Sequence, residues 1–110
     1  MNHSISSRHL LLLKNAPLNV MKLVADKNYT LFFFGNGSQE LMAYSLKKYQ
    51  DYFEYPFVRV SRSCMVNLKY VKKIDISEKK VLLKDGSELR ISRRKMPDVL
   101  KCVSGNISNP

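Results

Sequence analysis

Two short clusters of arginine and serine hold the residues of this sequence that could do chemistry. Ser61-Arg62-Ser63 lies between two apolar runs, and Ser92-Arg93-Arg94-Lys95 follows the last run with strand character. A guanidinium group offers a planar, permanently charged fork of donors that matches a phosphate or the O6/N7 edge of guanine. These residue types therefore indicate binding of nucleic acid.

Plainer explanations of both clusters stay open at this point. Arg62 could pair with a carboxylate such as Glu40 or Glu88, and Arg93 and Arg94 could be solubilising charges near a helix start. That position is poor for a cation, because the helix dipole is positive there. The serines beside the arginines could donate to phosphates or merely cap turns.

The charge of the chain is concentrated around these clusters. The 110 residues carry a formal charge of +10, and residues 59–101 hold 13 Lys and Arg against 5 Asp and Glu. Such a field attracts polyanions, that is, nucleic acid or an anionic membrane. The longest apolar run, residues 10–13, is far shorter than the roughly 20 residues that cross a bilayer, and neither predicted helix is long and basic on one face. We therefore expect no membrane partner.

Other chemistry has little support in the sequence. Cys64 and Cys102 have neither zinc-site spacing nor the pattern of a disulfide scaffold, so we expect small buried hydrophobic residues in a reducing cytoplasm. His3 and His9 lie in a polar terminus, and there is no glycine-rich phosphate loop. We expect no enzyme activity, no metal and no cofactor.

The arginine clusters need a scaffold, and the sequence predicts one domain of mainly β structure. Composition favours a folded core, with 45% apolar and 25% charged residues. Residues 1–9 are expected to form a flexible tail, 10–103 the domain and 104–110 a C-terminal tail. We predict about eight to ten short strands, at 10–13, 18–24, 29–34, 39–44, twice within 57–67, and at 71–76, 79–84 and 87–91.

Two short helices complete the prediction. Ser45 can cap a helix whose apolar face holds Leu46, Tyr49 and Phe53, and a second helix follows Lys95. Asp85-Gly86 is the strongest short hairpin signal. Both arginine clusters then lie where strands end, and a packed core would hold them there with little loss of rotamer entropy on binding.

With these residues in view, the sequence resembles the LytTR family of bacterial DNA-binding domains. The resemblance lies in FVRVSRSCMVN at 57–67, VLLKDGSELRISRR at 81–94 and KLVADKNYT at 22–30, and it covers residues 18–103. It implies an elongated, β-dominated fold in which loops, rather than a recognition helix, enter successive major grooves and bend the duplex. Many members carry a histidine where Ser61 stands, so the DNA target cannot be carried over.

The resemblance also implies a set of DNA contacts. The first group would contact bases: Arg62, Ser61, Arg94, Arg93, Asn28 and Tyr29. The second group would contact the DNA backbone: Ser63, Lys27, Arg59, Lys69, Ser92 and Lys95. The function implied is that of a sequence-specific, double-stranded DNA-binding transcription regulator in the cytoplasm.

Partners follow from the same resemblance. The family binds direct repeats in promoters, which predicts separate protomers on adjacent sites with weak self-association on DNA. An upstream sensor kinase system would fit, although we find no receiver domain in this chain. The alternative function is a single-stranded nucleic-acid-binding β-barrel, with Tyr29, Phe32, Phe34 and Tyr44 as a stacking platform. We expect those aromatic residues to fill the core rather than to stack on bases.

Overall fold

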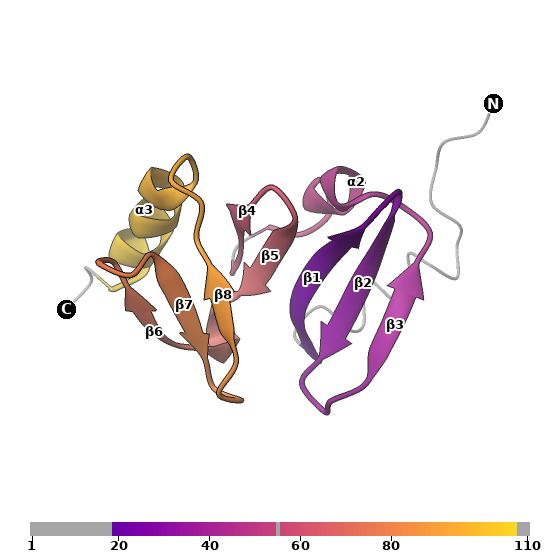
Figure 1. The fold of residues 1–110 in the computed structure, drawn as a ribbon, viewed down its shortest axis with the longest axis horizontal. Helices are drawn as coiled ribbons and strands as arrows, with labels where there is room; N and C mark the ends of the chain where they lie inside the picture. Colours follow the sequence, from indigo (N-terminus) through magenta and orange to yellow (C-terminus); the bar gives the residue numbers. More distant parts are fainter. Residues whose placement is uncertain (1–18, 55, 108–110) are drawn as a thin grey trace.

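The fold is an elongated arrangement of two antiparallel sheets and two short α-helices (Figure 1). The structure, a computed structural model, describes residues 19–54 and 56–107. The molecule extends 44 × 27 × 26 Å along its principal axes. The predicted mainly β class is therefore confirmed, with eight strands among the described residues. No helix in this part of the chain is long and apolar enough to cross a membrane.

The first sheet has five strands in the order β3-β2-β1-β5-β4. Its strands are β1 (Val20–Asp26), β2 (Tyr29–Phe34), β3 (Gln39–Met42), β4 (Phe57–Ser61) and β5 (Cys64–Asn67). Between β3 and β4 the chain forms α2 (Leu46–Gln50), and Ser45 caps it by accepting from the amide of Lys48.

The second sheet has three strands in sequence order. A short 3₁₀ helix, η2 (Leu68–Tyr70), leads from β5 into β6 (Val71–Asp75), which is followed by β7 (Lys80–Leu83), β8 (Glu88–Arg90) and α3 (Met96–Ile107). In Figure 1 this sheet and α3 lie at one end of the long axis, and β1, β2 and β3 lie at the other.

Period-two alternation along β4 separates two cores on the two faces of the first sheet. Phe57 belongs to a core with Phe32 and Tyr49, which α2 covers. Val58 and Val60 face the other core, where the second sheet and α3 pack. The first sheet is therefore the middle layer, and its strand ends are held from both faces.

Most predicted elements are confirmed, with shifted ends. The prediction for 29–34 matches β2, while β3 stops at Met42 rather than at residue 44. Phe53 lies beyond the end of α2, yet it stacks on Phe57 in the predicted core. The strand predicted at 10–13 and both tails lie outside the described residues or at their margin, so the domain limits stay predictions.

The hairpin prediction is confirmed, although four residues, 84–87, separate β7 from β8 rather than the two that Asp85-Gly86 favours. Gly86 takes φ 92°, and Ser87 donates to Asp85 Oδ1 from its amide (2.9 Å) and its hydroxyl (2.6 Å). The β2–β3 hairpin repeats this arrangement, with Gly37 at φ 92° and Ser38 donating twice to Asn36 Oδ1. The hydrogen bonds from Ser87 lower the pKa of Asp85.

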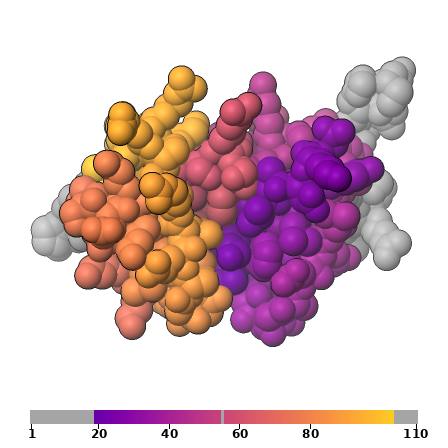
Figure 2. All heavy atoms as spheres, in the orientation of Figure 1, coloured from indigo at the N-terminus to yellow at the C-terminus, as the bar shows by residue number. Residues whose placement is uncertain are grey.

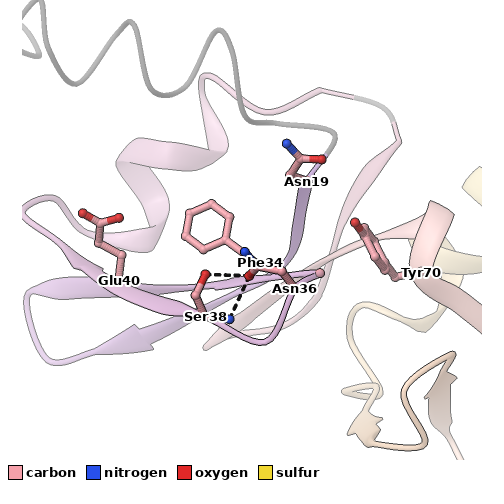
Figure 3. Close-up of a pocket in the computed structure, with 7 residues that line it drawn as sticks. Asn19, Phe34, Asn36, Ser38, Glu40 and Tyr70 are labelled. Carbon is pink, nitrogen blue, oxygen red and sulfur yellow. Dashed lines mark hydrogen bonds between the residues drawn. The ribbon is translucent and has the colours of Figure 1, made fainter.

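Tyr70 of η2 connects the β2–β3 hairpin to the second sheet. A Cβ at Gly35 would lie 2.4 Å from the Tyr70 hydroxyl oxygen, and the Tyr70 carbonyl accepts from the amide of Lys84 at 2.8 Å. Figure 3 shows Tyr70 beside a hollow of about 640 Å³ that Asn36, Ser38 and Glu40 also line. Among the residues that the structure describes, no lysine or arginine lines this hollow.

We predict that Gly35→Ala lowers the free energy of unfolding by about 1–3 kcal/mol, because the methyl group would overlap the Tyr70 ring. Urea denaturation of the single and double variants measures this. In a Tyr70→Ala background the same substitution should cost clearly less. An equal cost in both backgrounds would contradict the close contact as its cause.

Candidate nucleic-acid interface

Three turns form a row along one edge of the molecule. They are the β1–β2 turn (27–28), the β4–β5 turn (62–63) and the β8–α3 turn (91–95). Figure 1 shows them at the top of the view, in the order β8–α3, β4–β5, β1–β2 along the long axis. We call them the edge row. The hairpin turns after β2 and β7 lie at the opposite edge.

Two backbone hydrogen bonds tie the three turns of the edge row together. The amide of Ser92 donates to the carbonyl of Val60 at 2.8 Å, which joins the β8–α3 turn to β4. The amide of Ala25 donates to the carbonyl of Ser63, also at 2.8 Å, which joins the end of β1 to the β4–β5 turn. The row is thus a continuous unit, although its parts are more than 60 residues apart in sequence.

Arg59 holds the β4–β5 turn from the inside. Its Nε donates to the carbonyl of Ser61 at 2.8 Å, its Nη2 donates to the carbonyl of Arg62, and its Nη1 donates to Gln50 Oε1 on α2. Partial burial lowers the pKa of Arg59. A planar fork suits this arrangement, since one side chain reaches three acceptors. Three of its five N–H donors are therefore used within the protein.

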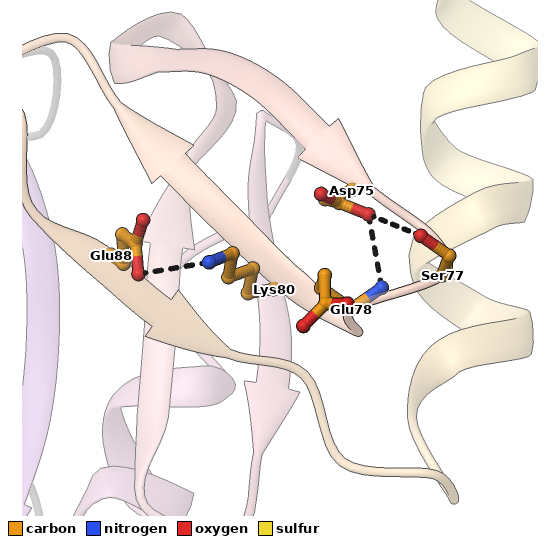
Figure 4. Close-up of polar contacts among 5 residues, drawn as sticks. All are labelled: Asp75, Ser77, Glu78, Lys80 and Glu88. Carbon is orange, nitrogen blue, oxygen red and sulfur yellow. Dashed lines mark hydrogen bonds and ion pairs between the residues drawn. The ribbon is translucent and has the colours of Figure 1, made fainter.

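Arg62 is exposed and makes no ion pair with any residue that the structure describes. Of the two carboxylates considered as its partner, Glu88 pairs with Lys80 at 3.3 Å (Figure 4). Glu40 lines the hollow beside the β2–β3 hairpin, at the opposite edge. The pairing that would have explained Arg62 without a ligand is therefore absent from the described residues.

Figure 4 also shows how the β6–β7 turn uses its own carboxylate. Asp75 accepts from the amide of Glu78 and from the hydroxyl of Ser77, both at 2.9 Å. These two hydrogen bonds lower the pKa of Asp75. The Asp75 carboxylate therefore accepts hydrogen bonds from residues of its own turn.

The β8–α3 turn presents Arg93 and Arg94 directly before a helix. Both side chains are exposed, and neither contacts a carboxylate among the residues described. Ser92 Oγ accepts from the amide of Lys95 at 3.2 Å, and the Ser92 carbonyl accepts from the amide of Met96. The positive end of α3 adds to the arginine charges, so an external anion is favoured here.

The serines of the edge row cap turns. Ser61 Oγ accepts from the amide of Ser63 at 3.3 Å, as Ser92 Oγ does for Lys95. Accepting a hydrogen bond leaves the hydroxyl proton available to donate. The two explanations of these serines are therefore compatible.

The β1–β2 turn contains an unusual backbone conformation at Lys27. Its φ is 59°, a left-handed value that costs a residue with a Cβ about 1–2 kcal/mol. Asn28 and Tyr29 follow, both exposed, with Tyr29 at 49%. Lys79 in the β6–β7 turn has a similar φ of 56°.

Two of the residues predicted to contact the DNA backbone, Lys69 and Arg59, do not lie in the turns of the edge row. Lys69 is exposed on η2, at the far end of β5 from the edge row. Arg59 lies on β4 next to the edge row, and its guanidinium group already donates to the carbonyls of Ser61 and Arg62 and to Gln50. Gln50 was missed, because its partner lies nine residues away on another element and no local pattern marks such a contact.

The aromatic stacking platform is not formed. Phe32 is 1% exposed, its ring lies 4.9 Å from that of Tyr49, and Phe34 and Tyr44 pack against the same core. Of the four aromatic residues considered, Tyr29 alone is largely exposed. The structure therefore does not favour the single-stranded alternative.

A shallow hollow of about 460 Å³ lies below the edge row, lined by residues that include Ser61, Ser63, Cys64, Arg90 and Ser92. Burial raises the pKa of the Cys64 thiol to about 11, so the thiol is protonated at neutral pH. The prediction of a small buried residue is thereby confirmed for Cys64. Cys102 is half-buried.

Comparisons with family profiles and with solved structures point to the same family. The profile of the LytTr DNA-binding domain matches residues 12–104. Among solved structures, a LytTr DNA-binding domain from Bacillus cereus, described as part of a methyl-accepting/DNA response regulator, is similar with a TM-score of 0.71 and 22% identity, over 79% of this chain and 83% of that chain. The structural likeness concerns the fold. No curated protein matches the chain.

We predict that Arg59→Lys reduces sequence discrimination on duplex DNA while leaving the salt dependence of binding unchanged. Lysine keeps the charge but cannot reach three acceptors, so the β4–β5 turn would loosen. The measurement compares affinities for a duplex selected from random sequence and for a mixed-sequence duplex, at several salt concentrations. Gln50→Ala, which removes one acceptor, should show a smaller effect of the same kind. An unchanged affinity ratio in Arg59→Lys would rule out the positioning role.

We predict that Lys27→Gly raises the free energy of unfolding by roughly 0.5–1 kcal/mol, because glycine adopts positive φ without strain. The same variant should bind duplex DNA more weakly, through the loss of a phosphate contact. Lys79→Gly is the matched control, with the same strain and charge outside the edge row. It should gain stability and keep its DNA affinity. Equal affinity losses in both variants would remove Lys27 from the interface.

Proposed function

Because the chain belongs to the LytTR family of DNA-binding domains, we propose that it is a sequence-specific transcription regulator that binds double-stranded DNA through the edge row. Three observations support this assignment: the row lies on one edge, the guanidinium groups of its arginines have no internal partners among the described residues, and its turns hold no acidic residue. The activity is binding alone, without catalysis or a cofactor.

The arrangement of the edge row along the long axis carries the proposal. The molecule is 44 Å long, and one turn of B-DNA repeats every 34–36 Å or so. The two end turns could therefore enter successive major grooves on one side of a duplex. The β4–β5 turn lies between them, next to the β8–α3 turn, and would face the narrower minor groove that separates two major grooves.

Each turn would then have its own task. Arg93 and Arg94 would reach base edges in one major groove, and Asn28 and Tyr29 would do so in the next. Arg62 would enter the minor groove, where the negative potential attracts arginine. The phosphates beside the three groove contacts would be bound by Ser63, Lys27, Ser92 and Lys95. These contacts would supply the salt-dependent part of the affinity. Bending of the duplex would bring all three contacts into register.

The partners proposed follow from this geometry and from the family. Each protomer would occupy one site, so direct repeats in promoters would place protomers side by side with weak self-association on DNA. Control by an upstream sensor kinase system is part of the same proposal.

We predict that Arg94→Ala weakens binding to the selected duplex by about 1–3 kcal/mol and binding to a mixed-sequence duplex far less. Arg62→Ala should also weaken the selected complex, mainly where the site is rich in A·T pairs. Lys72→Ala, an exposed charge on β6, is the control. Fluorescence anisotropy gives the affinities.

Two outcomes would contradict the proposal. Equal losses on selected and mixed duplexes would reduce these arginines to phosphate contacts. Tighter binding to the separated strands than to the duplex would replace double-stranded recognition by single-stranded binding.

A further inference from the structure

We infer that α2 provides a fourth DNA contact, in which Lys47 binds a backbone phosphate beside the β4–β5 turn. The inference rests on the proposed function and extends it to an element outside the three turns. It follows from where α2 is anchored, which way its flanks face and what its lysines contact.

The position of α2 is fixed by the first core. Leu46 and Tyr49 are buried, and the ring of Tyr49 contacts those of Phe32 and Tyr44. In Figure 1, α2 lies at the same edge as the row, between the β4–β5 and β1–β2 turns along the long axis. Figure 2 shows side chains in the colour of the α2 segment projecting from that edge, next to those of the β4–β5 segment.

The two flanks of α2 are told apart by their contacts. Gln50 accepts from Arg59, whose other donors hold the carbonyls of Ser61 and Arg62, so the Gln50 flank faces the β4–β5 turn. Lys47 precedes Gln50 by three residues and therefore lies on the same flank. The ammonium group of Lys48 lies 5.5 Å from the ring centroid of Tyr44, on the other flank.

The ammonium group of Lys47 has no partner among the described residues. The side chain is exposed and makes no ion pair or hydrogen bond with a described residue. Lys47 and Lys48 both lie in the last turn of α2, where a cation interacts favourably with the helix dipole. That interaction would be the same for both lysines, so it cannot account for a difference between them in DNA binding.

The test compares Lys47→Gln with Lys48→Gln in the full chain. Each variant removes one charge from neighbouring positions of one helix. Affinities for the selected duplex and for a mixed-sequence duplex are measured across a salt series, and urea denaturation confirms that both variants are folded. Lys47→Gln should weaken binding roughly fivefold at physiological ionic strength, equally on both duplexes, and lower the salt slope by about 1. Lys48→Gln should leave affinity and slope close to wild type.

Other outcomes would overturn the inference. Equal losses in the two variants would show that the lysines act only through the overall field, and unchanged binding in Lys47→Gln would place α2 outside the interface. If the wild-type chain bound no duplex, the proposed function would fail and the inference with it. Wild-type binding with an unaffected Lys47→Gln would reject the α2 contact alone.

Discussion

The hydrogen bond from the Ser92 amide to the Val60 carbonyl is the constraint on which the proposed interface depends. β4 is an edge strand of the first sheet, and a β-bulge between Arg59 and Ser61 shifts its register just before the turn. An edge strand presents backbone groups that need partners. The amide of Ser92 is the partner of one such group, the Val60 carbonyl. Val60 of β4 and Val99 of α3 belong to the same core, which keeps these two elements together. The second sheet and the first thereby present their turns at one edge.

This constraint reduces the conformational entropy that the turns would lose on binding a ligand. An arginine on a free loop loses backbone and rotamer freedom when it binds, at a cost of about 1–2 kcal/mol per residue for the backbone alone. In this protein much of that entropy is already lost on folding, since Arg59 donates to the carbonyls of Ser61 and Arg62 and the Ser92 hydroxyl accepts from Lys95 within the β8–α3 turn. In the proposed complex, the exposed arginines of the row would then lose mainly side-chain freedom.

Local patterns in the sequence predicted local structure well. β2, the Ser45 cap and the Asp85-Gly86 hairpin each depend on a few adjacent residues, and each was found. The clustering of arginines at strand ends could also be predicted. The joining of the edge row could not, because a bond from Ser92 to Val60 spans two sheets and leaves no periodic signal. For the same reason Arg59 was expected to face DNA, whereas its fork is largely used by Gln50 and the turn.

The two edges of the molecule differ in how their turns use polar groups. At the edge opposite the row, Asn36 and Asp85 each accept two hydrogen bonds from the serine that follows the turn glycine, so these turns satisfy themselves. Two turns of the edge row are also capped by serines, but they carry guanidinium groups without partners in the described chain, and Lys27 in the third has positive φ. The left-handed conformation is not special to this edge, because Lys79 in the β6–β7 turn shares it, whereas exposed guanidinium groups are free to donate to an anionic ligand. An anionic ligand along this edge would give those donors partners, and this difference between the two edges supports our proposal that DNA binds there.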